Sequence, residues 1–238
     1  MNMTIALILA GGSGQRMGQS IPKQFLCVDN KPIFIYTLER FQACDAIDKI
    51  CVCCVPGWET CVTAYAEQFG ITKLHAVVCG GATRFMSVYH ALTAVSDIAE
   101  ADDIVMTYDA VRPLITDEMI RDAIEKTKQY GAAVGVLPCY DSMYAVAEEG
   151  DVLLNSKQNR SVLYRGTGPD TVLYGTIMAL YEEYLPEDAG LTIIEMLIDH
   201  GLSVAASLSS NKCIKLTTVE DVELFQAMLK YEKYDWLR

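Results

Sequence analysis

Basic residues are scarce in this chain of 238 residues. It has 19 lysines and arginines against 31 aspartates and glutamates, which gives a formal net charge of −12. Proteins that bind the phosphate backbone of nucleic acids over a broad face carry clustered basic residues. We therefore expect no nucleic-acid partner. A small anionic ligand remains compatible with this composition, because it needs only a few cations in one place.

A long apolar run and a secretory leader are absent as well. The first apolar run, Ile5–Ala10, is too short to cross a bilayer, and glycines follow it instead of a cleavage site. The nine cysteines are odd in number, and three of them crowd into the apolar run 51–55. A disulfide framework usually has an even number of spaced cysteines. We expect a cytoplasmic protein with no membrane contact, whose reduced thiols serve as small core side chains.

Clustered metal ligands are also lacking. Cys51-x-x-Cys54 is not joined by a second cysteine pair, and His75, His90 and His200 lie far apart in the sequence. Structural zinc sites need four ligands with close pairwise spacing. We therefore do not expect these cysteines to bind a metal.

Repeats and low-complexity linkers do not divide the chain, so we expect one domain over residues 1–238. Short, continuously apolar runs, as in buried parallel strands, alternate with helical patterns. This alternation predicts a three-layer α/β/α sandwich with a mostly parallel, Rossmann-like sheet. The expected strands are Thr4–Leu9, Lys49–Val55, Leu74–Val78, Ile104–Thr107 and Ala132–Pro138.

The pattern changes after Pro138. Short alternating stretches surround Glu149-Gly150-Asp151, a sequence that favours a hairpin turn, and we expect an inserted β-arm at 139–166. Further on, the sequence predicts helices at 171–184 and 188–199, then a strand at Cys213–Leu216. A last helix follows, where Thr218 and Asp221 have the spacing of a capping box.

The clearest chemical signal follows the first strand, in Ala10-Gly11-Gly12-Ser13-Gly14-Gln15-Arg16-Met17-Gly18. Glycines at the end of a strand let backbone N–H groups approach phosphates, although a plain tight turn would also use them. A P-loop would need Gly-Lys-Ser/Thr here, and a dinucleotide fingerprint fails at Met17. Arg16 and Lys23 follow the glycines. Two cations at this place favour a polyphosphate ligand.

This segment, with Pro22-Lys23-Gln24-Phe25-Leu26, resembles the signature of sugar- and polyol-phosphate cytidylyltransferases. Three further segments match the family in the right order, from residue 5 to residue 221 overall. They are Gly80-Gly81-Ala82-Thr83-Arg84-Phe85-Met86-Ser87-Val88, Tyr108-Asp109-Ala110-Val111-Arg112-Pro113 and Ile214-Lys215-Leu216-Thr217. The resemblance implies a nucleotidyltransferase, GT-A-like fold and transfer of CMP from CTP to a polyol phosphate, with Mg²⁺ as cofactor. The branches that it resembles make CDP-methylerythritol or CDP-ribitol.

The resemblance also implies roles for individual residues. Arg16 and Lys23 would be catalytic and stabilise charge at the α-phosphorus and on pyrophosphate. Asp109 would hold a hydroxyl, near Mg²⁺. The remaining nucleotide-binding residues would be Ala10, Gly11, Gly12, Ser13, Gly14, Gly81, Ala82, Arg84, Ser87 and Ala110.

Arg112, Arg160 and Lys215 would face the acceptor phosphate, with Arg160 supplied by Arg160-Ser-Val-Leu-Tyr164 of the β-arm. In this family the arm packs against a second subunit, which implies a homodimer with shared sites. Plain structural interpretations stay open for these residues. Asp109 could cap a turn, Arg84, Arg112 and Arg160 could be surface residues, and Lys215 could extend from a strand edge.

Three segments depart from the family pattern. Gly168-Pro169-Asp170 replaces Thr-Pro-Gln, and Tyr108 replaces a histidine. Pro186-Glu187-Asp188-Ala189-Gly190 replaces a Thr-Asp segment, so we expect a threonine hydroxyl near the acceptor phosphate to be missing. The nucleotide-side motifs are intact and the acceptor-side motifs differ, which indicates CTP use with an altered acceptor.

Between the two acceptors, Pro22–Leu26, Asn30–Ile33, Pro56–Trp58 and Asp109–Pro113 read closer to the ribitol 5-phosphate branch. The alternatives are 2-C-methyl-D-erythritol 4-phosphate, a non-catalytic CTP-binding homologue, and a nucleotidyltransferase that uses UTP or another base.

Overall fold

The computed structural model describes residues 2–12, 21–185 and 190–232. Within these ranges, seven strands form a central sheet in the order β11-β7-β10-β6-β1-β4-β5. Every neighbouring pair is parallel except those of β10, which is antiparallel to both β6 and β7. The strands are β1 (Thr4–Ala10), β4 (Lys49–Cys54), β5 (Leu74–Cys79), β6 (Ile104–Asp109), β7 (Ala132–Pro138), β10 (Tyr164–Leu173) and β11 (Ala205–Ser207).

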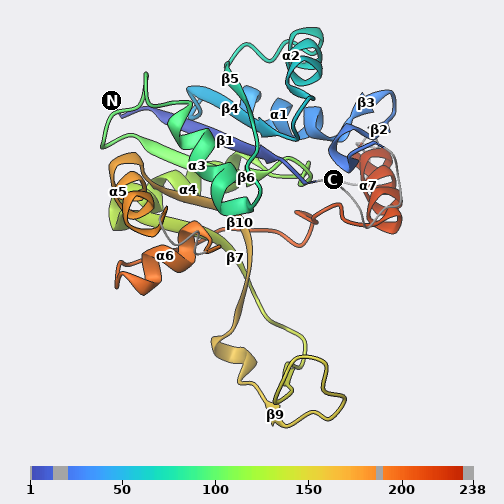
Figure 1. The fold of residues 1–238 in the computed structure, drawn as a ribbon. Coiled ribbons are helices and arrows are strands. Elements are labelled where there is room, and N and C mark those ends of the chain that lie inside the picture. Colours follow the sequence, from blue (N-terminus) through green and yellow to red (C-terminus); the bar gives the residue numbers. More distant parts are fainter. Residues whose placement is uncertain (1, 13–20, 186–189, 233–238) are drawn as a thin grey trace.

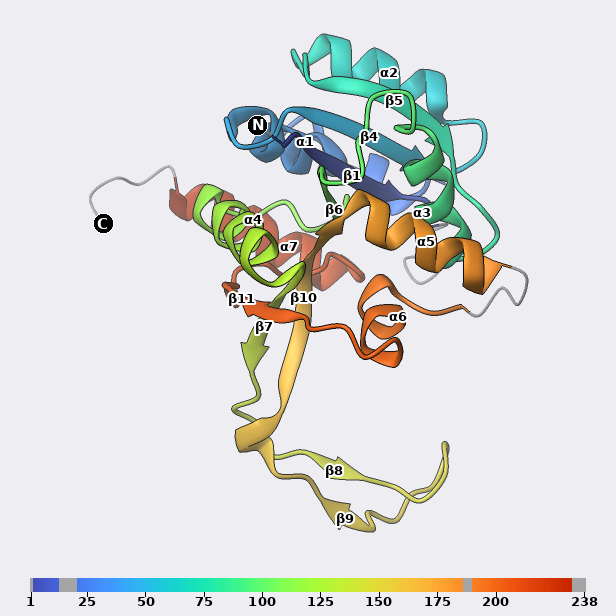
Figure 2. The same ribbon diagram turned by 90° about the vertical axis from the view of Figure 1, so that its left-hand side faces the viewer.

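Helices cover both faces of the sheet, and this confirms the expected three-layer architecture (Figures 1 and 2). On one face lie α1 (Ile33–Ala43), α2 (Glu59–Gln68) and α4 (Asp117–Tyr130). On the other lie α3 (Arg84–Thr93), α5 (Tyr174–Tyr184) and α6 (Ile193–Asp199). The last helix, α7 (Val219–Glu232), packs beside the short pair β2 (Cys27–Val28) and β3 (Lys31–Pro32).

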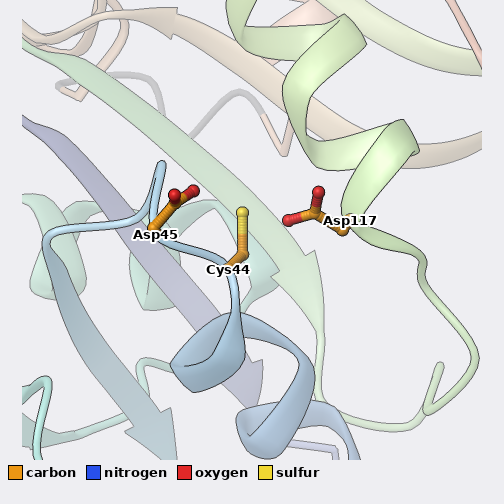
Figure 3. Close-up of side chains that lie close together, drawn as sticks. All are labelled: Cys44, Asp45 and Asp117. Carbon is orange, nitrogen blue, oxygen red and sulfur yellow. The ribbon is translucent and has the colours of Figure 1, made fainter.

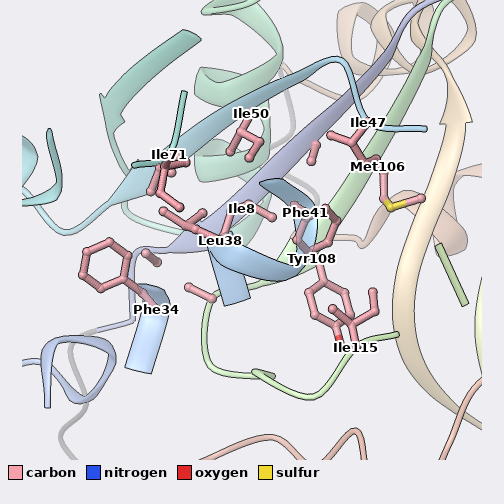
Figure 4. Close-up of a cluster of buried hydrophobic side chains, with 14 of the residues drawn as sticks. Ile8, Phe34, Leu38, Phe41, Ile47, Ile50, Ile71, Met106, Tyr108 and Ile115 are labelled. Atoms are coloured by element: carbon pink, nitrogen blue, oxygen red, sulfur yellow. The ribbon is translucent and has the colours of Figure 1, made fainter. Parts of the chain in front are cut away.

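The central strand β1 is apolar throughout because both of its faces are buried. Ala6 and Ile8 belong to the core under α1, whereas Ile5 and Leu7 belong to the core under α3. Figure 4 shows the first core, with Ile8 among the aromatic and branched side chains of α1.

Five of the nine cysteines are buried as expected, whereas Cys27 and Cys79 are exposed and Cys61 and Cys139 are half-buried. Cys51, Cys53 and Cys54 on β4 are fully buried, and all nine cysteines are free. Burial raises the pKa of each of these three thiols to about 12. Such thiols are protonated at neutral pH and unreactive.

In the described part of the chain, no helix combines the length and the apolar composition that a bilayer crossing requires.

Two expected elements differ in their bounds. The helix expected from 171 begins at Tyr174, because 171–173 complete β10. Thr171 is fixed between strands, where its Oγ1 donates to the carbonyl of Ala133 at 3.0 Å, so sheet pairing prevails over the helical pattern. The helix expected at 188–199 begins at Ile193; residues 188 and 189 lie outside the described ranges.

The strand expected at Cys213–Leu216 is wrong. This segment has no regular secondary structure and does not pair with the sheet, whose described edge beside β7 is formed by β11. The Leu216 N–H instead donates to the Val111 carbonyl at 2.9 Å. The expected capping box after it is present: the Thr218 N–H donates to Asp221 Oδ2 at 2.8 Å, and the Asp221 N–H donates to Thr218 Oγ1 at 3.4 Å.

Between β7 and β10 the chain leaves the sheet and returns. Here β8 (Tyr144–Ala145) pairs antiparallel with β9 (Ser156–Lys157), and the short 3-10 helix η3 (Arg160–Val162) leads back into β10. This region, the β-arm, projects away from the sheet in both views (Figures 1 and 2).

Candidate active site

Two adjoining pockets lie at the ends of β1, β5, β6 and β10. The first, which we call the glycine pocket, has a volume of about 230 Å³. The second, the β10 pocket, has a volume of about 420 Å³. The carboxyl ends of parallel strands meet at one edge of a sheet, which is where α/β proteins bind ligands. The glycine pocket is lined by Leu9, Gly11, Gly12, Gly81, Ala82, Thr83, Arg84, Ser87, Asp109 and Lys215.

The two pockets share Arg84, Asp109 and Lys215. The Asp109 carboxylate accepts from Lys215 Nζ at 3.0 Å and from Arg112 Nε at 3.1 Å. Burial alone would raise the pKa of this carboxyl, but Lys215, Arg84 and Arg112 together hold it below its ordinary value. Asp109 is therefore ionised and fixes two cations at the boundary between the pockets.

The glycine pocket is built on the beginning of α3. Thr83 caps the helix by accepting from the Met86 N–H at 3.1 Å, and the Gly81 N–H donates to Ser87 Oγ at 3.1 Å. A Cβ on Gly81 would lie 2.3 Å from the Cβ of Met86, so this turn requires glycine. Backbone N–H groups at a helix N-terminus favour anions. The structure thus brings Gly11, Gly12, Gly81, Ala82, Arg84 and Ser87 together, as the sequence predicted.

The short 3-10 helix η2 (Lys23–Phe25) supports the described start of the glycine segment, Ala10–Gly12. Gln24 is buried and its Nε2 donates to the carbonyls of Ala10 at 2.6 Å and Gly12 at 3.1 Å. Lys23 is the first residue of η2. The predicted site residues Ser13, Gly14 and Arg16 lie outside the described residues.

Within the described ranges, neither pocket is lined by four of the predicted residues: Ala10, Lys23, Ala110 and Arg160. Two of them, Ala10 and Ala110, act through position. Ala10 and Ala110 are buried in the core, and the Ala110 N–H donates to the carbonyl of Leu9 at 2.9 Å. The Ala110 carbonyl accepts from Thr37 Oγ1 at 2.8 Å. The first bond joins the ends of β1 and β6, and the second ties this point to α1; together they fix the backbone next to Asp109.

The β10 pocket contains Arg112 and Lys215, as predicted for the acceptor side. The Arg112 side chain is only 15% exposed, and its Nη1 donates to the carbonyl of Cys213 at 3.0 Å. It is therefore a fixed cation of the site instead of a free surface residue. The other lining residues are Arg84, Thr107, Tyr108, Asp109, Val134, Val136, Tyr164, Gly166, Thr167, Gly168, Asp170, Thr192 and Ile194.

A threonine is present in the β10 pocket at another position, Thr192. It lines the β10 pocket and caps α6, accepting from the Glu195 N–H at 3.3 Å. The capping spacing Thr192-x-x-Glu195 was the available signal. Thr167 lines the same pocket from β10, a strand whose alternating pattern is obscured by Gly166, Gly168 and Pro169.

Asp170 also lines the β10 pocket, on a strand that the sequence did not predict. Its side chain is 14% exposed, and its Oδ2 lies 3.7 Å from Arg84 Nη2. Burial raises the pKa of the Asp170 carboxyl to about 6; the Asp109 carboxylate adds to this shift, while Arg84 and Arg112 oppose it.

Arg160 is not part of either pocket of its own chain. It lies in η3 of the β-arm, is exposed, and donates through Nη1 to the carbonyl of Tyr140 at 2.6 Å. The β-arm points away from the sheet, which separates Arg160 from the other predicted residues (Figure 1).

Among the described residues, one group of possible metal ligands lies close together, formed by Cys44, Asp45 and Asp117 (Figure 3). The guanidinium of Arg121 already pairs with both carboxylates there, at 2.6 Å to Asp117 Oδ2. Burial raises the pKa of the Cys44 thiol to about 11, so the thiol is protonated at neutral pH. These three residues therefore do not form a metal site. In the two pockets, Asp109 is the carboxylate that lines both.

Comparisons with known proteins agree with this geometry. The family profile described as 2-C-methyl-D-erythritol 4-phosphate cytidylyltransferase matches residues 4–231. A ribitol-5-phosphate cytidylyltransferase of Lacticaseibacillus paracasei is 37% identical, with 96% of this chain and 98% of the relative covered. A 2-C-methyl-D-erythritol 4-phosphate cytidylyltransferase of Clostridium botulinum is 34% identical, with 97% and 99% covered. The solved 4-diphosphocytidyl-2C-methyl-D-erythritol synthase of Anaerococcus prevotii shares the fold, with a TM-score of 0.82, 23% identity, and 96% and 99% of the two chains covered.

Proposed function

Because the chain belongs to the 2-C-methyl-D-erythritol 4-phosphate cytidylyltransferase family, we propose that it transfers CMP from CTP to a polyol phosphate, with ribitol 5-phosphate as acceptor. The observation that carries this proposal is the pair of pockets joined at Arg84, Asp109 and Lys215. The glycine pocket, lined by Gly11, Gly12 and the residues that begin α3, suits a nucleoside triphosphate. The β10 pocket, with Arg112 and Lys215, suits a phosphorylated acceptor.

In the reaction, a phosphate oxygen of the acceptor attacks the α-phosphorus of CTP. The new bond joins that oxygen to phosphorus, the bond from the α-phosphorus to its bridging oxygen breaks, and the electron pair leaves with pyrophosphate. The attacking oxygen is already ionised near neutral pH, so no general base is needed. Catalysis then consists of alignment and charge stabilisation.

The position of each residue suggests its role in this reaction. Lys215 lines both pockets and would stand where the acceptor phosphate meets the α-phosphorus; Arg112 lines the β10 pocket alone and would hold the acceptor phosphate. Lys23 follows the glycine segment and, with Arg16, would stabilise the leaving pyrophosphate. Asp109 keeps Lys215 and Arg112 oriented, because it is hydrogen-bonded to both.

We also propose Mg²⁺ as the cofactor. Mg²⁺ is usually bound by one or two carboxylates together with substrate phosphates, and the Asp109 carboxylate, an ionised oxygen donor on the wall of the glycine pocket, fits this donor set. When bound, the ion would neutralise charge on the triphosphate.

The choice of ribitol 5-phosphate rests on two supports. The relative at 37% identity bears that substrate in its name, and the segments Pro22–Leu26 and Asp109–Pro113 read closer to that branch. The second candidate acceptor is 2-C-methyl-D-erythritol 4-phosphate, which the relative at 34% identity bears in its name.

Arg160 can serve an acceptor phosphate only if a second copy of the chain brings it there. We propose a homodimer formed through the β-arm, whose exposed apolar side chains include Val152 and Leu153, 90% and 78% exposed. We further propose a cytoplasmic location, since reducing compartments keep cysteines free, as all nine are here.

The test is pyrophosphate release from CTP and Mg²⁺ with a panel of pentitol and tetritol phosphates. We expect release with ribitol 5-phosphate in preference to 2-C-methyl-D-erythritol 4-phosphate. The reverse order would support the second candidate. CTP binding without release from any acceptor would indicate a non-catalytic homologue and overturn the proposal.

The same assay with UTP in place of CTP tests the base. Equal or faster release with UTP would overturn the assignment to CTP. A thermal-shift titration with each nucleotide gives an independent reading, because a ligand that binds the native state raises its melting temperature.

A further inference from the structure

The β10 pocket contains a carboxylate that its proposed phosphate ligand does not explain. The pocket is lined by the cations Arg84, Arg112 and Lys215 and by the carboxylates Asp109 and Asp170. Asp109 is satisfied by close ion pairs with Arg112 and Lys215. Asp170 is not held in this way, because its ion pair with Arg84 is long, at 3.7 Å. An ionised carboxylate repels a phosphate, so Asp170 must face another part of the acceptor.

Asp170 is also placed rigidly. It lies within β10, opposite Thr107 of β6 on one side and Val134 of β7 on the other. Side chains on paired strands are positioned more accurately than those on loops. Thr107 lines the same pocket, and its buried Oγ1 lies close enough to the Asp170 carboxylate to help keep it ionised, but it makes no hydrogen bond of regular geometry within the part of the chain that the structure describes. This wall of the pocket is polar and incompletely satisfied without a ligand.

A polyol phosphate offers hydroxyl groups that match this wall. An ionised carboxylate only accepts hydrogen bonds, and hydroxyls donate them. The charged groups around Asp170 are Arg84 on α3, Asp109 on β6, and Arg112 and Lys215 on the segments that follow β6 and β11. Although burial raises the pKa of Asp170 to about 6, the carboxyl is mostly ionised at neutral pH.

We propose that Asp170 is a specificity-determining residue of the acceptor site, whose carboxylate accepts hydrogen bonds from hydroxyls of the polyol chain. The inference rests on the proposed function and deepens it: Arg112 and Lys215 bind the acceptor phosphate, and Asp170 selects the carbon chain attached to it. Arg84, which lines both pockets, links this recognition to the nucleotide.

The first test compares wild type with Asp170→Asn, using the best acceptor of the panel. Loss of a hydrogen bond to a charged group should raise the acceptor KM about 10- to 100-fold. The KM for CTP should change much less than the acceptor KM, because Arg84 is the one ion-pair link between Asp170 and the glycine pocket that the described residues show, and the Mg²⁺ requirement should stay unchanged. Asp199→Asn, at an exposed aspartate of α6, is the matched control and should behave like wild type. An unchanged acceptor KM, or a loss that appears in the Mg²⁺ requirement instead, would overturn the inference.

The second test removes the hydroxyl from the ligand. Ribitol 5-phosphates that each lack one of the hydroxyls at carbons 1 to 4 are assayed with wild type and with Asp170→Asn. At least one analogue should be a poor acceptor for wild type and lose nothing further in the variant, because the two changes remove the same bond. If wild type accepts all analogues equally well, the inference is wrong even without a folded variant. If wild type turns over no polyol phosphate, the proposed function fails and this inference fails with it.

Discussion

A single carboxylate organises the site at the scale of residues. Asp109 binds Arg112, three positions along the chain, and Lys215, which comes from the far end of the sequence. Arg112 is also held by the Cys213 carbonyl, whereas the printed ion pair of Lys215, whose side chain is 40% exposed, is with Asp109. The shared ion pairs keep both at the boundary between the pockets, so that their charge is in place before an anionic substrate arrives.

Asp170 provides a prediction on stability. Its carboxyl has a pKa of about 6 in the folded protein, above the ordinary value of 3.8, because burial disfavours the charge. The folded state thus binds its proton more tightly than the unfolded chain does. This group favours folding most below about pH 4, and its contribution is lost as the pH rises through 6. We expect Asp170→Asn to stabilise the protein at pH 8, by about 1–3 kcal/mol.

Thermal unfolding of the two proteins at pH 5 and pH 8 checks this expectation. The gain in melting temperature should be largest at pH 8 and about half as large at pH 5, which lies between the two pKa values. A lower melting temperature of Asp170→Asn at pH 8 would mean that the carboxylate holds the fold together. A gain in stability with a loss of acceptor recognition is typical of a residue kept for function.

At the scale of elements, the turn before α3 shapes the glycine pocket. A Cβ at Gly81 would lie 2.3 Å from the Cβ of Met86, whereas a Cβ at Gly12 would meet no atom within 4 Å. We expect Gly81→Ala to lower stability by about 1–3 kcal/mol, as overpacking does, and to weaken CTP binding because the start of α3 must shift. Calorimetric titration with CTP and thermal unfolding measure the two effects.

Gly12→Ala is the control for stability and should melt like wild type, because open space surrounds that position. If Gly81→Ala matched wild type in both melting temperature and CTP affinity, the turn would not shape the pocket as described.

The sequence predicted the elements whose signal is local. The strands β1, β4, β6 and β7 are mostly apolar and mostly buried, and the edge strand β5 is apolar but only half-buried. The glycine-rich segment after β1 and the segment around Gly81 can be recognised from residue type. The sequence did not predict β10, since Gly166, Gly168 and Pro169 break the strand pattern and its partners β6 and β7 are distant in sequence. Because β10 was not predicted, the positions of Thr167 and Asp170 in the wall of the β10 pocket were not predicted either.

Lys215 shows the reverse case. Its role was predicted from a short segment, although the strand assigned to that segment is wrong. Its position depends on the hydrogen bond from Leu216 to Val111 and on the packing of Phe225 in α7 against the same cluster. Such contacts between distant segments are not visible in local periodicity.

At the scale of the whole molecule, the net charge of −12 and the anionic ligands are compatible. The described cations of the site, Arg84, Arg112 and Lys215, gather at one edge of the sheet, while most other charges face solvent. Local charge, not net charge, decides whether a pocket binds phosphate.

The β-arm bears on assembly. Its tip carries Val152, Leu153 and Leu154, with exposed fractions from 64% to 90%, and exposed apolar clusters of this kind mark interfaces. We expect sedimentation to give a species of twice the chain mass of 26.3 kDa. Replacing Val152 and Leu153 together by aspartate should give monomers, whereas Ile198→Asp, at an exposed position of α6, should leave the dimer intact. A monomeric wild-type protein would contradict the proposed dimer.

The central claim is that CTP and the acceptor occupy the two joined pockets at the same time. Initial rates of pyrophosphate release, with CTP and ribitol 5-phosphate both varied, test it most directly. Direct transfer within a ternary complex predicts double-reciprocal lines that intersect. Parallel lines, the pattern of a covalent CMP–enzyme intermediate, would contradict the account.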